Sequence, residues 1–118
     1  MDERLTPQER IRKKKEFLTL YKTGSRYRGR YFYLVYRTNS FGFPRLAVVV
    51  SKKVGNAVTR NKIKRRIRAL FRRNKPQFKK PMDVVFIAKR EILDLSVTDL
   101  AAEFFLALKR IFTEQPAR

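Results

Sequence analysis

The sequence contains no cysteine, no histidine and no tryptophan. Without cysteine the chain can form neither a disulfide bond nor a reactive thiolate. Because histidine is absent as well, the usual zinc ligand sets and the histidine-based catalytic dyads are excluded. A chain without cysteine fits a reducing compartment, and we expect a cytoplasmic protein.

Acidic residues are missing from the middle of the chain. Between Glu16 and Asp83 there is no aspartate or glutamate across 66 residues, so all 10 acidic residues lie in the two ends. They stand against 30 lysines and arginines, which gives a net charge of +20 and a pI near 11.2. This asymmetry predicts one large positive surface whose natural ligand is a polyphosphate backbone. An anionic membrane is the alternative ligand.

Long hydrophobic runs are also absent. No apolar segment reaches the roughly 18 residues that span a bilayer, and residues 1–10 are charged where a secretory signal would be apolar. Hydrophobic residues nevertheless make up 43% of the 118 residues, enough to build one core. We therefore expect a soluble, folded and non-exported protein that forms a single domain over 1–118.

Local patterns in the first half predict a helix followed by two strands. Residues 6–9 have the form of a capping box, which predicts the start of a helix or of a separate turn before it. Apolar residues at helical spacing, ended by Gly24, predict a helix over 13–22. The segments 30–37 and 45–51 are rich in aromatic and β-branched residues, and we expect them to pair as an antiparallel hairpin. The first of these strands would carry aromatic side chains on both faces.

A strongly basic helix is predicted next. Gly55 is expected to make a left-handed turn, and Asn56 or Thr59 to cap a helix that ends near Asn74. Its apolar stripe comprises Ile63, Ile67, Leu70 and Phe71, and the side facing away from this stripe comprises Asn61, Arg65, Arg68 and Arg72. From Lys52 to Lys80 the chain has 13 lysines and arginines and no acid. Such unpaired like charges repel, which favours contact with phosphates over a merely solvated face.

The carboxylates of the C-terminal third are the remaining candidates for catalysis. They are Asp83, Glu91, Asp94, Asp99 and Glu103. Asp83 lies in an apolar run over 82–88 that predicts a buried strand, and others suit the first turns of a last helix from Ser96 or Thr98 to Phe112. We interpret them as structural and not as a Mg²⁺ nuclease site, so no catalytic and no metal-binding residue is predicted in the protein. The predicted fold class is α+β, with the order α-β-β-α-β-α.

Several segments together resemble the bacterial ribonuclease P protein component. The central motif reads Ser-Lys-Lys-Val-Gly-Asn-Ala-Val over 51–58 and Arg-Asn-Lys-Ile-Lys-Arg-Arg-Ile-Arg over 60–68. The resemblance also covers 10–12, the aromatic segment 17–24 and the late strand through Arg90, which is most of the chain. Lys62 stands where the family usually has arginine, a change that keeps the charge and removes the forked phosphate contact.

The resemblance implies a fold and an activity. The fold is a compact two-layer α-β sandwich with a left-handed crossover around the basic helix and a fourth, short strand within 25–28. Similar proteins bind a large catalytic RNA that cleaves the 5′ leader from precursor tRNA, using Mg²⁺ held mainly by the RNA. The chain is thus expected to be an endoribonuclease subunit whose catalytic centre lies in the RNA, with the catalytic RNA and precursor tRNA as partners and no membrane or obligatory protein partner.

The resemblance also implies two binding sites. The residues that match the contact with the catalytic RNA are Arg60, Asn61, Lys62, Lys64, Arg65 and Arg68. The residues that match a cleft for the single-stranded leader are Phe17, Tyr21, Tyr33, Lys52, Lys53, Asn56 and Arg90. Unpaired bases are open to stacking, whereas structured RNA presents phosphates. By pattern alone, an ordinary core position is favoured over base stacking for these aromatic residues.

Three other functions remain open. A ribosomal protein-like or RNA-chaperone module would bind RNA without a role in cleavage. A DNA-compacting protein would bind duplex DNA as tightly as RNA, although the aromatic residues in the strands oppose it. A cationic membrane-surface protein is opposed by the narrow apolar stripe of the basic helix, which the core needs.

Overall fold

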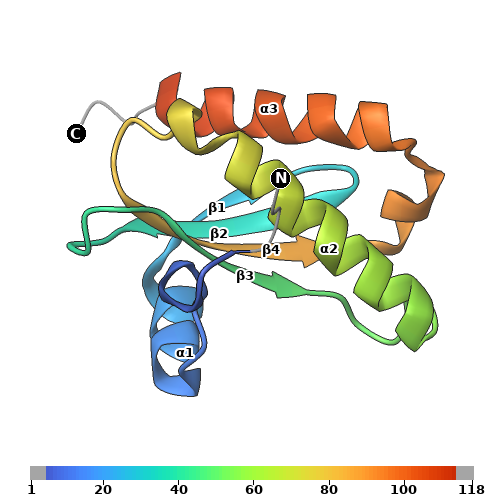
Figure 1. Ribbon diagram of the computed structural model, residues 1–118, viewed down its shortest axis with the longest axis horizontal. Helices are drawn as coiled ribbons and strands as arrows, with labels where there is room; N and C mark the ends of the chain where they lie inside the picture. Colours follow the sequence, from blue (N-terminus) through green and yellow to red (C-terminus); the bar gives the residue numbers. More distant parts are fainter. Residues whose placement is uncertain (1–4, 114–118) are drawn as a thin grey trace.

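The computed structural model describes residues 5–113, which form a four-stranded sheet with helices on both faces (Figure 1). In chain order the elements are η1 (Pro7–Glu9), α1 (Lys14–Thr23), β1 (Ser25–Arg28), β2 (Phe32–Thr38), β3 (Arg45–Val49), α2 (Ala57–Arg73), η2 (Lys75–Gln77), β4 (Met82–Ala88), η3 (Arg90–Asp94) and α3 (Val97–Thr113). Helices α2 and α3 cover one face of the sheet, and α1 lies against the other. The α+β class is confirmed, and β1 is the short strand that the resemblance implied.

The strand order is β1-β2-β4-β3, and it corrects one prediction. Strand β2 is antiparallel to β1 and β4, whereas β3 is parallel to β4. The predicted hairpin of 30–37 with 45–51 is therefore wrong, because β4 lies between these two segments. The connecting loop crosses the start of β4 instead, where the Asn39 N–H donates to the carbonyl oxygen of Pro81 at 3.1 Å. The apolar β4 is buried from both sides in this central position, with Val84, Val85 and Phe86 inaccessible to solvent.

Helix α2 joins the parallel neighbours β3 and β4 and so forms the crossover. Asn56 is its N-cap, with Oδ1 accepting the Thr59 N–H at 2.9 Å, and the helix ends before Asn74 as predicted. The left-handed turn predicted at Gly55 is wrong, since Gly42 is the only residue with positive φ within 5–113. Gly55 serves a different purpose: a Cβ there would lie 3.0 Å from Thr59 Cγ2, so the glycine allows the first turn of α2 to approach closely.

Two apolar clusters hold the sheet and the helices together. The larger one lies between the sheet and α2 and α3, and it includes the predicted stripe of Ile63, Ile67, Leu70 and Phe71. The smaller one lies under α1 and consists of Ile11, Leu20, Val35 and Val85, with Phe17, Ala47, Val49 and Ile87 partly buried around it. The smaller cluster leaves part of this sheet face open, and Tyr33 of β2 remains 39% exposed there.

The predicted capping box is present, and it caps the start of the short helix η1, not the start of α1. The N–H and Oγ1 of Thr6 donate to Oε1 of Glu9 at 2.9 and 3.2 Å. The chain then runs along the outer edge of β3, where Arg10 forms a parallel bridge with Leu46 and the Ile11 N–H donates to the Leu46 carbonyl at 3.0 Å. This short segment partly covers an edge strand that would otherwise be unpaired.

Candidate nucleic-acid interface

An aromatic hollow lies between α1 and the open part of the sheet. Phe17 and Tyr21 are one turn apart on α1, and their rings stack with centroids 5.9 Å apart and an interplanar angle of 11°. Tyr21 and Tyr33 line a hollow of about 230 Å³ together with Arg26 and Arg28 of β1. The structure therefore brings an aromatic residue of α1 and one of β2 to the same place, as the cleft prediction requires.

Cations stand beside both tyrosines of this hollow. The guanidinium carbon of Arg26 lies 4.8 Å from the centre of the Tyr21 ring, and its Nη2 donates to the Tyr21 carbonyl at 2.7 Å. Lys89 Nζ lies 5.2 Å from the centre of the Tyr33 ring. Arg28 is the register partner of Tyr33 in the β1–β2 pair. Rings flanked by cations suit a single strand of nucleic acid, because the rings stack on bases and the cations contact phosphates.

Sequence reasoning did not include Arg26, Arg28 and Lys89 in the cleft. Arg26 and Arg28 are two residues apart in an extended strand, so their side chains lie on one face of β1. That alternation would have been a usable signal if 25–28 had been recognised as a strand from its own residues. Lys89 follows β4, and its proximity to Tyr33 depends on the β2–β4 pairing, which no local pattern contains.

The predicted rim residues gather at one end of the sheet. Strands β3 and β4 are parallel, so they finish at the same end of the sheet. Lys52 and Lys53 follow β3 there, and Arg90 follows β4. These three side chains are exposed, and none of them lines the hollow. Asn56 is exposed too, and its side chain is engaged in capping α2.

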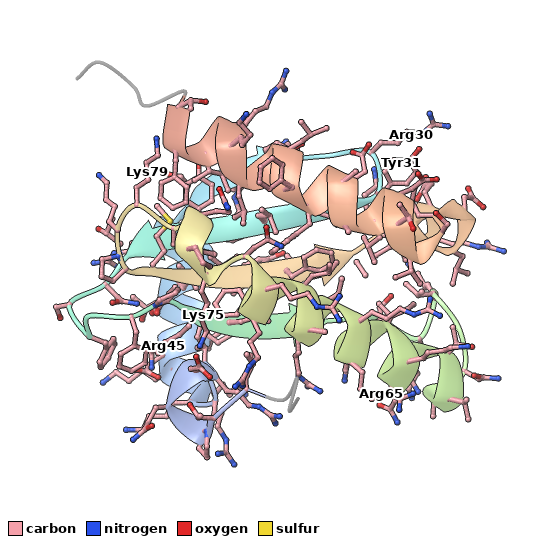
Figure 2. The ribbon with its side chains drawn as sticks, turned by 45° about the horizontal axis from the view of Figure 1, so that its top comes forward. Arg30, Tyr31, Arg45, Arg65, Lys75 and Lys79 are labelled. Atoms are coloured by element: carbon pink, nitrogen blue, oxygen red, sulfur yellow. The ribbon has the colours of Figure 1, made fainter. Side chains whose placement is uncertain are left out.

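Helix α2 presents a basic surface on the opposite side of the sheet. Asn61, Lys62 and Arg65 are exposed, and Figure 2 shows Arg65 projecting away from the body of the molecule. Arg60 and Lys64 are partly buried along one side of the helix. The first turn of α2 has no acidic residue, so nothing in it complements the positive end of the helix dipole. An RNA phosphate would supply that missing negative charge.

Arg68 departs from its predicted position. The helical pattern places Arg68 and Arg72 away from the apolar stripe, yet both are partly buried. Arg72 lines a small hollow together with Thr6 and Glu9, so this side of α2 faces the N-terminal segment. Burial lowers the pKa of Arg68, and the positive charge of Arg10 lowers it further. A helical wheel cannot show that another segment packs there.

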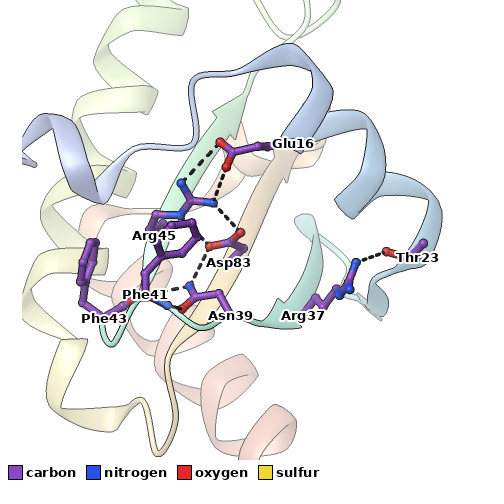
Figure 3. A network of polar contacts seen from close by, with 8 residues as sticks. All are labelled: Glu16, Thr23, Arg37, Asn39, Phe41, Phe43, Arg45 and Asp83. Atoms are coloured by element: carbon purple, nitrogen blue, oxygen red, sulfur yellow. Dashed lines mark hydrogen bonds and ion pairs between the residues drawn. The ribbon is translucent and has the colours of Figure 1, made fainter.

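A buried arginine fastens α1 to the sheet, and sequence reasoning missed it. Arg45 of β3 is only 7% exposed and donates Nε and Nη2 to the two carboxylate oxygens of Asp83 at 2.9 and 2.8 Å (Figure 3). Its Nη1 and Nη2 also reach Glu16 of α1 at 3.4 Å each. The Phe41 ring covers the guanidinium at 4.1 Å. The signal that could have found this network is Asp83 itself, because a carboxylate in a buried strand needs a partner.

A second polar pair holds the other end of α1. Arg37 of β2 donates Nη1 to Thr23 Oγ1 at 2.8 Å, one residue before the helix-ending Gly24 (Figure 3). A Cβ on Gly24 would lie 2.8 Å from the Leu20 carbonyl oxygen and 2.9 Å from that of Tyr36, so this glycine permits close packing of the helix end on β2. Both ends of α1 are thus tied to the sheet, and Phe17 and Tyr21 lie between the two ties.

The carboxylates of the C-terminal third are the remaining candidates for a catalytic or metal site. Within 5–113, no group of three or more carboxylates is placed to hold a metal ion. Of the five C-terminal carboxylates, Asp83 is engaged by Arg45 and Asn39, and Asp99 is in the first turn of α3. No helix in the described part of the chain has both the length and the apolar character that a membrane crossing demands.

The family model and two sequence relatives that match this chain are all described as ribonuclease P proteins. A family model described as Ribonuclease P matches residues 5–112. The chain is 42% identical over 106 residues to the ribonuclease P protein component of Syntrophus aciditrophicus (strain SB), which covers 90% of this chain and 89% of that protein. It is 39% identical over 92 residues to the ribonuclease P protein component of Thermotoga maritima, and the match covers 78% of this chain and 79% of that protein.

Solved structures agree with the sequence relatives. The RNase P protein of Thermotoga maritima superposes with a TM-score of 0.79 at 35% identity, covering 86% of this chain and 96% of that chain. A Staphylococcus aureus RNase P protein superposes with a TM-score of 0.79, also at 35% identity, and the match covers 86% of this chain and 93% of that chain. The family match spans α1, the sheet and α2, so it includes both the aromatic hollow and the basic helix.

Proposed function

Because the chain belongs to the ribonuclease P protein family, we propose that it is the protein subunit of a ribonucleoprotein that removes the 5′ leader from precursor tRNA. The catalytic centre lies in the RNA subunit, and the protein contributes binding. The observation that carries this proposal is the separation of two unlike sites: an acid-free basic helix on one face of the sheet and an aromatic hollow flanked by cations on the other.

Helix α2 binds the catalytic RNA in this proposal. Structured RNA offers mainly phosphates to a protein, and cationic side chains without carboxylate neighbours are suited to contact them. The contacting residues are those carried over from the family, Arg60, Asn61, Lys62, Lys64, Arg65 and Arg68. Lys62 acts as a point charge there, since an ammonium group cannot form the two parallel hydrogen bonds that a guanidinium forms with phosphate.

The aromatic hollow binds the single-stranded leader. Phe17, Tyr21 and Tyr33 stack on unpaired bases, and Arg26, Arg28 and Lys89 neutralise the leader phosphates beside the rings. The rim at Lys52, Lys53, Asn56 and Arg90 guides the strand past the end of the sheet. Mature tRNA has no leader, so this site raises the affinity for the precursor alone.

The charge of the protein also affects the metal requirement. A net charge of +20 reduces repulsion between the phosphates of the two RNAs, so less Mg²⁺ is needed to bring them together. The Mg²⁺ ions used in cleavage are held mainly by RNA. The holoenzyme acts in the cytoplasm, where precursor tRNA is made.

Reconstitution tests the proposal. A bacterial ribonuclease P RNA is combined with labelled precursor tRNA at low Mg²⁺, with the protein or with polylysine of the same total charge. The protein is expected to restore accurate leader removal and to favour precursor over mature tRNA, whereas polylysine provides only unspecific neutralisation. Tight RNA binding without any stimulation of cleavage would favour a ribosomal protein-like or RNA-chaperone module instead. Equally tight binding to duplex DNA would favour a DNA-compacting protein.

A further inference from the structure

Two partly buried arginines from distant parts of the chain, Arg10 beside the outer edge of β3 and Arg68 of α2, lie close enough for their charges to interact. Arg10 forms the bridge with Leu46, and Ile11 next to it places its side chain in the cluster under α1. Successive side chains of an extended segment point to opposite faces, so the Arg10 side chain points toward α2. Leu46 itself belongs to the larger cluster on that side. Arg68 of α2 lies there as well and experiences the charge of Arg10.

Neither arginine is neutralised by a carboxylate within 5–113. The Nε atom of Arg10 is buried and has no hydrogen-bond partner. The adjacent carboxylate, Glu9, is already engaged, since its Oε1 accepts from Thr6 and its Oε2 pairs with Lys75 Nζ. A buried guanidinium nitrogen without a partner is unfavourable, and a second guanidinium close by adds repulsion. An anion bound by both guanidinium groups would offset the repulsion between them.

We propose that Arg10 and Arg68 together bind one phosphate of the RNA backbone, which makes Arg10 a further RNA-binding residue. This inference rests on the proposed binding of the catalytic RNA along α2. A phosphodiester suits the position because its two non-bridging oxygens can accept hydrogen bonds from two guanidinium groups at once. Arg60, Lys64 and Arg68 are spaced four residues apart and so form a row of cations along α2. The successive phosphates of a polyanion can contact such a row, whereas a lone carboxylate can contact only one of its members.

The folded state sets the distance between the two guanidinium groups. Arg10 is tied to β3 by its backbone bridge, and Arg68 is held by the packing of Ile67 and Phe71 in the larger cluster. The unfolded chain has no such pair, so an anion bound here stabilises the folded protein. The site can therefore be tested by protein stability as well as by RNA binding.

The first experiment uses inorganic phosphate as the probe. The thermal midpoint is measured in phosphate and in chloride at equal ionic strength for the wild type, Arg10→Ala, Arg68→Ala and the control Arg12→Ala. Arg12 is an exposed neighbour whose replacement removes the same charge. We expect phosphate to raise the midpoint of the wild type and of the control by about 5 °C, and the increase to be lost in the other two variants.

The second experiment measures affinity for the catalytic RNA over a range of salt concentrations. Arg10→Ala is expected to weaken binding about tenfold and to reduce the salt slope by about one unit, as for one lost phosphate contact. The double variant with Arg68→Ala should bind little worse than Arg68→Ala alone, because both side chains hold the same phosphate. Arg10→Lys should keep the slope and lose part of the affinity.

The outcomes separate the possible explanations. Equal effects of Arg10→Ala and Arg12→Ala in both experiments would overturn the proposal. Loss of the phosphate effect without a change in RNA binding would mean a site for free anions, which overturns the RNA assignment. If the protein fails to stimulate cleavage while Arg10→Ala still reduces the salt slope, the proposed function is wrong and the phosphate site stands. If Arg10→Ala does not fold, Arg10→Lys provides the comparison.

Discussion

Arg45 and Asp83 are register partners in the parallel β3–β4 pair, and their side chains form a two-pronged ion pair with distances of 2.9 and 2.8 Å. The pair lies under α1, where Arg45 also reaches Glu16. Glu16 precedes Phe17 in α1, and the Phe17 ring stacks on Tyr21, which lines the aromatic hollow. Fold stability and the geometry of the hollow are therefore linked through one guanidinium.

Replacing Arg45 with methionine should destabilise the protein strongly. The variant leaves the partly buried Asp83 carboxylate without its main partner, which costs about 3 kcal/mol. Chemical denaturation measures the loss. Lys22→Met on the exposed side of α1 is the matched control and should change the free energy of unfolding by less than about 0.5 kcal/mol. A loss as small as that of the control would show that the pair does not stabilise the fold.

The effect of Arg45→Met should not depend on pH across the neutral range. Hydrogen bonding to Asp83 raises the pKa of Arg45 above its ordinary value despite burial. A raised pKa gives stabilisation that is complete below the pKa of the unfolded state and is lost only as the pH rises through the higher folded value. Denaturation from about pH 6 to about pH 9 should therefore yield the same difference between variant and wild type. A difference that fades within this range would contradict the assignment.

Replacing Phe17 and Tyr21 with alanine should weaken binding of precursor tRNA and leave binding of mature tRNA unchanged. Stacking of one base on an aromatic side chain is worth about 1 to 3 kcal/mol. Competition binding with both tRNAs by the holoenzyme measures the change. Phe105→Ala is the control, because Phe105 is a similarly exposed ring on α3, across the sheet from the hollow. Equal losses for precursor and mature tRNA would refute the leader assignment.

Replacing Arg65 with alanine should flatten the salt dependence of binding to the catalytic RNA by about one unit of slope. Arg65 is exposed on α2 and is expected to contact one phosphate. Lys109→Ala on the outer side of α3 removes the same charge away from this surface and should leave the slope unchanged. An unaltered slope for Arg65→Ala would mean that this side chain does not touch phosphate.

Replacing Lys62 with arginine should tighten binding of the catalytic RNA a few-fold. A guanidinium can make the forked phosphate contact that the ammonium group of Lys62 cannot make. Lys53→Arg, at the rim and outside α2, is the control for a general effect of arginine. If both changes tighten binding equally, or neither does, Lys62 does not occupy a phosphate position on the RNA.

The secondary structure was largely predictable because its signals are local. Helical spacing of apolar residues located α2, with Asn56 as one of its two candidate caps, and the apolar run at 82–88 located β4 in the centre of the sheet. The pairing of strands was not predictable in the same way. The expected hairpin failed because β2 and β3, which are neighbours in the chain, are separated in the sheet by β4. Strand β4 begins only at Met82, after the long crossover that follows the end of β3 at Val49.

The sequence by itself determined the electrostatics and the chemistry of this protein. Its acid-free stretch of 66 residues makes the basic surface inevitable, and the lack of cysteine and histidine removes most catalytic options whatever the fold. Only the tertiary structure decided which side chains act together. The hollow of Tyr21 and Tyr33, the Arg45–Asp83 pair and the meeting of Arg10 with Arg68 each join distant segments, because strand pairing and helix packing set those distances.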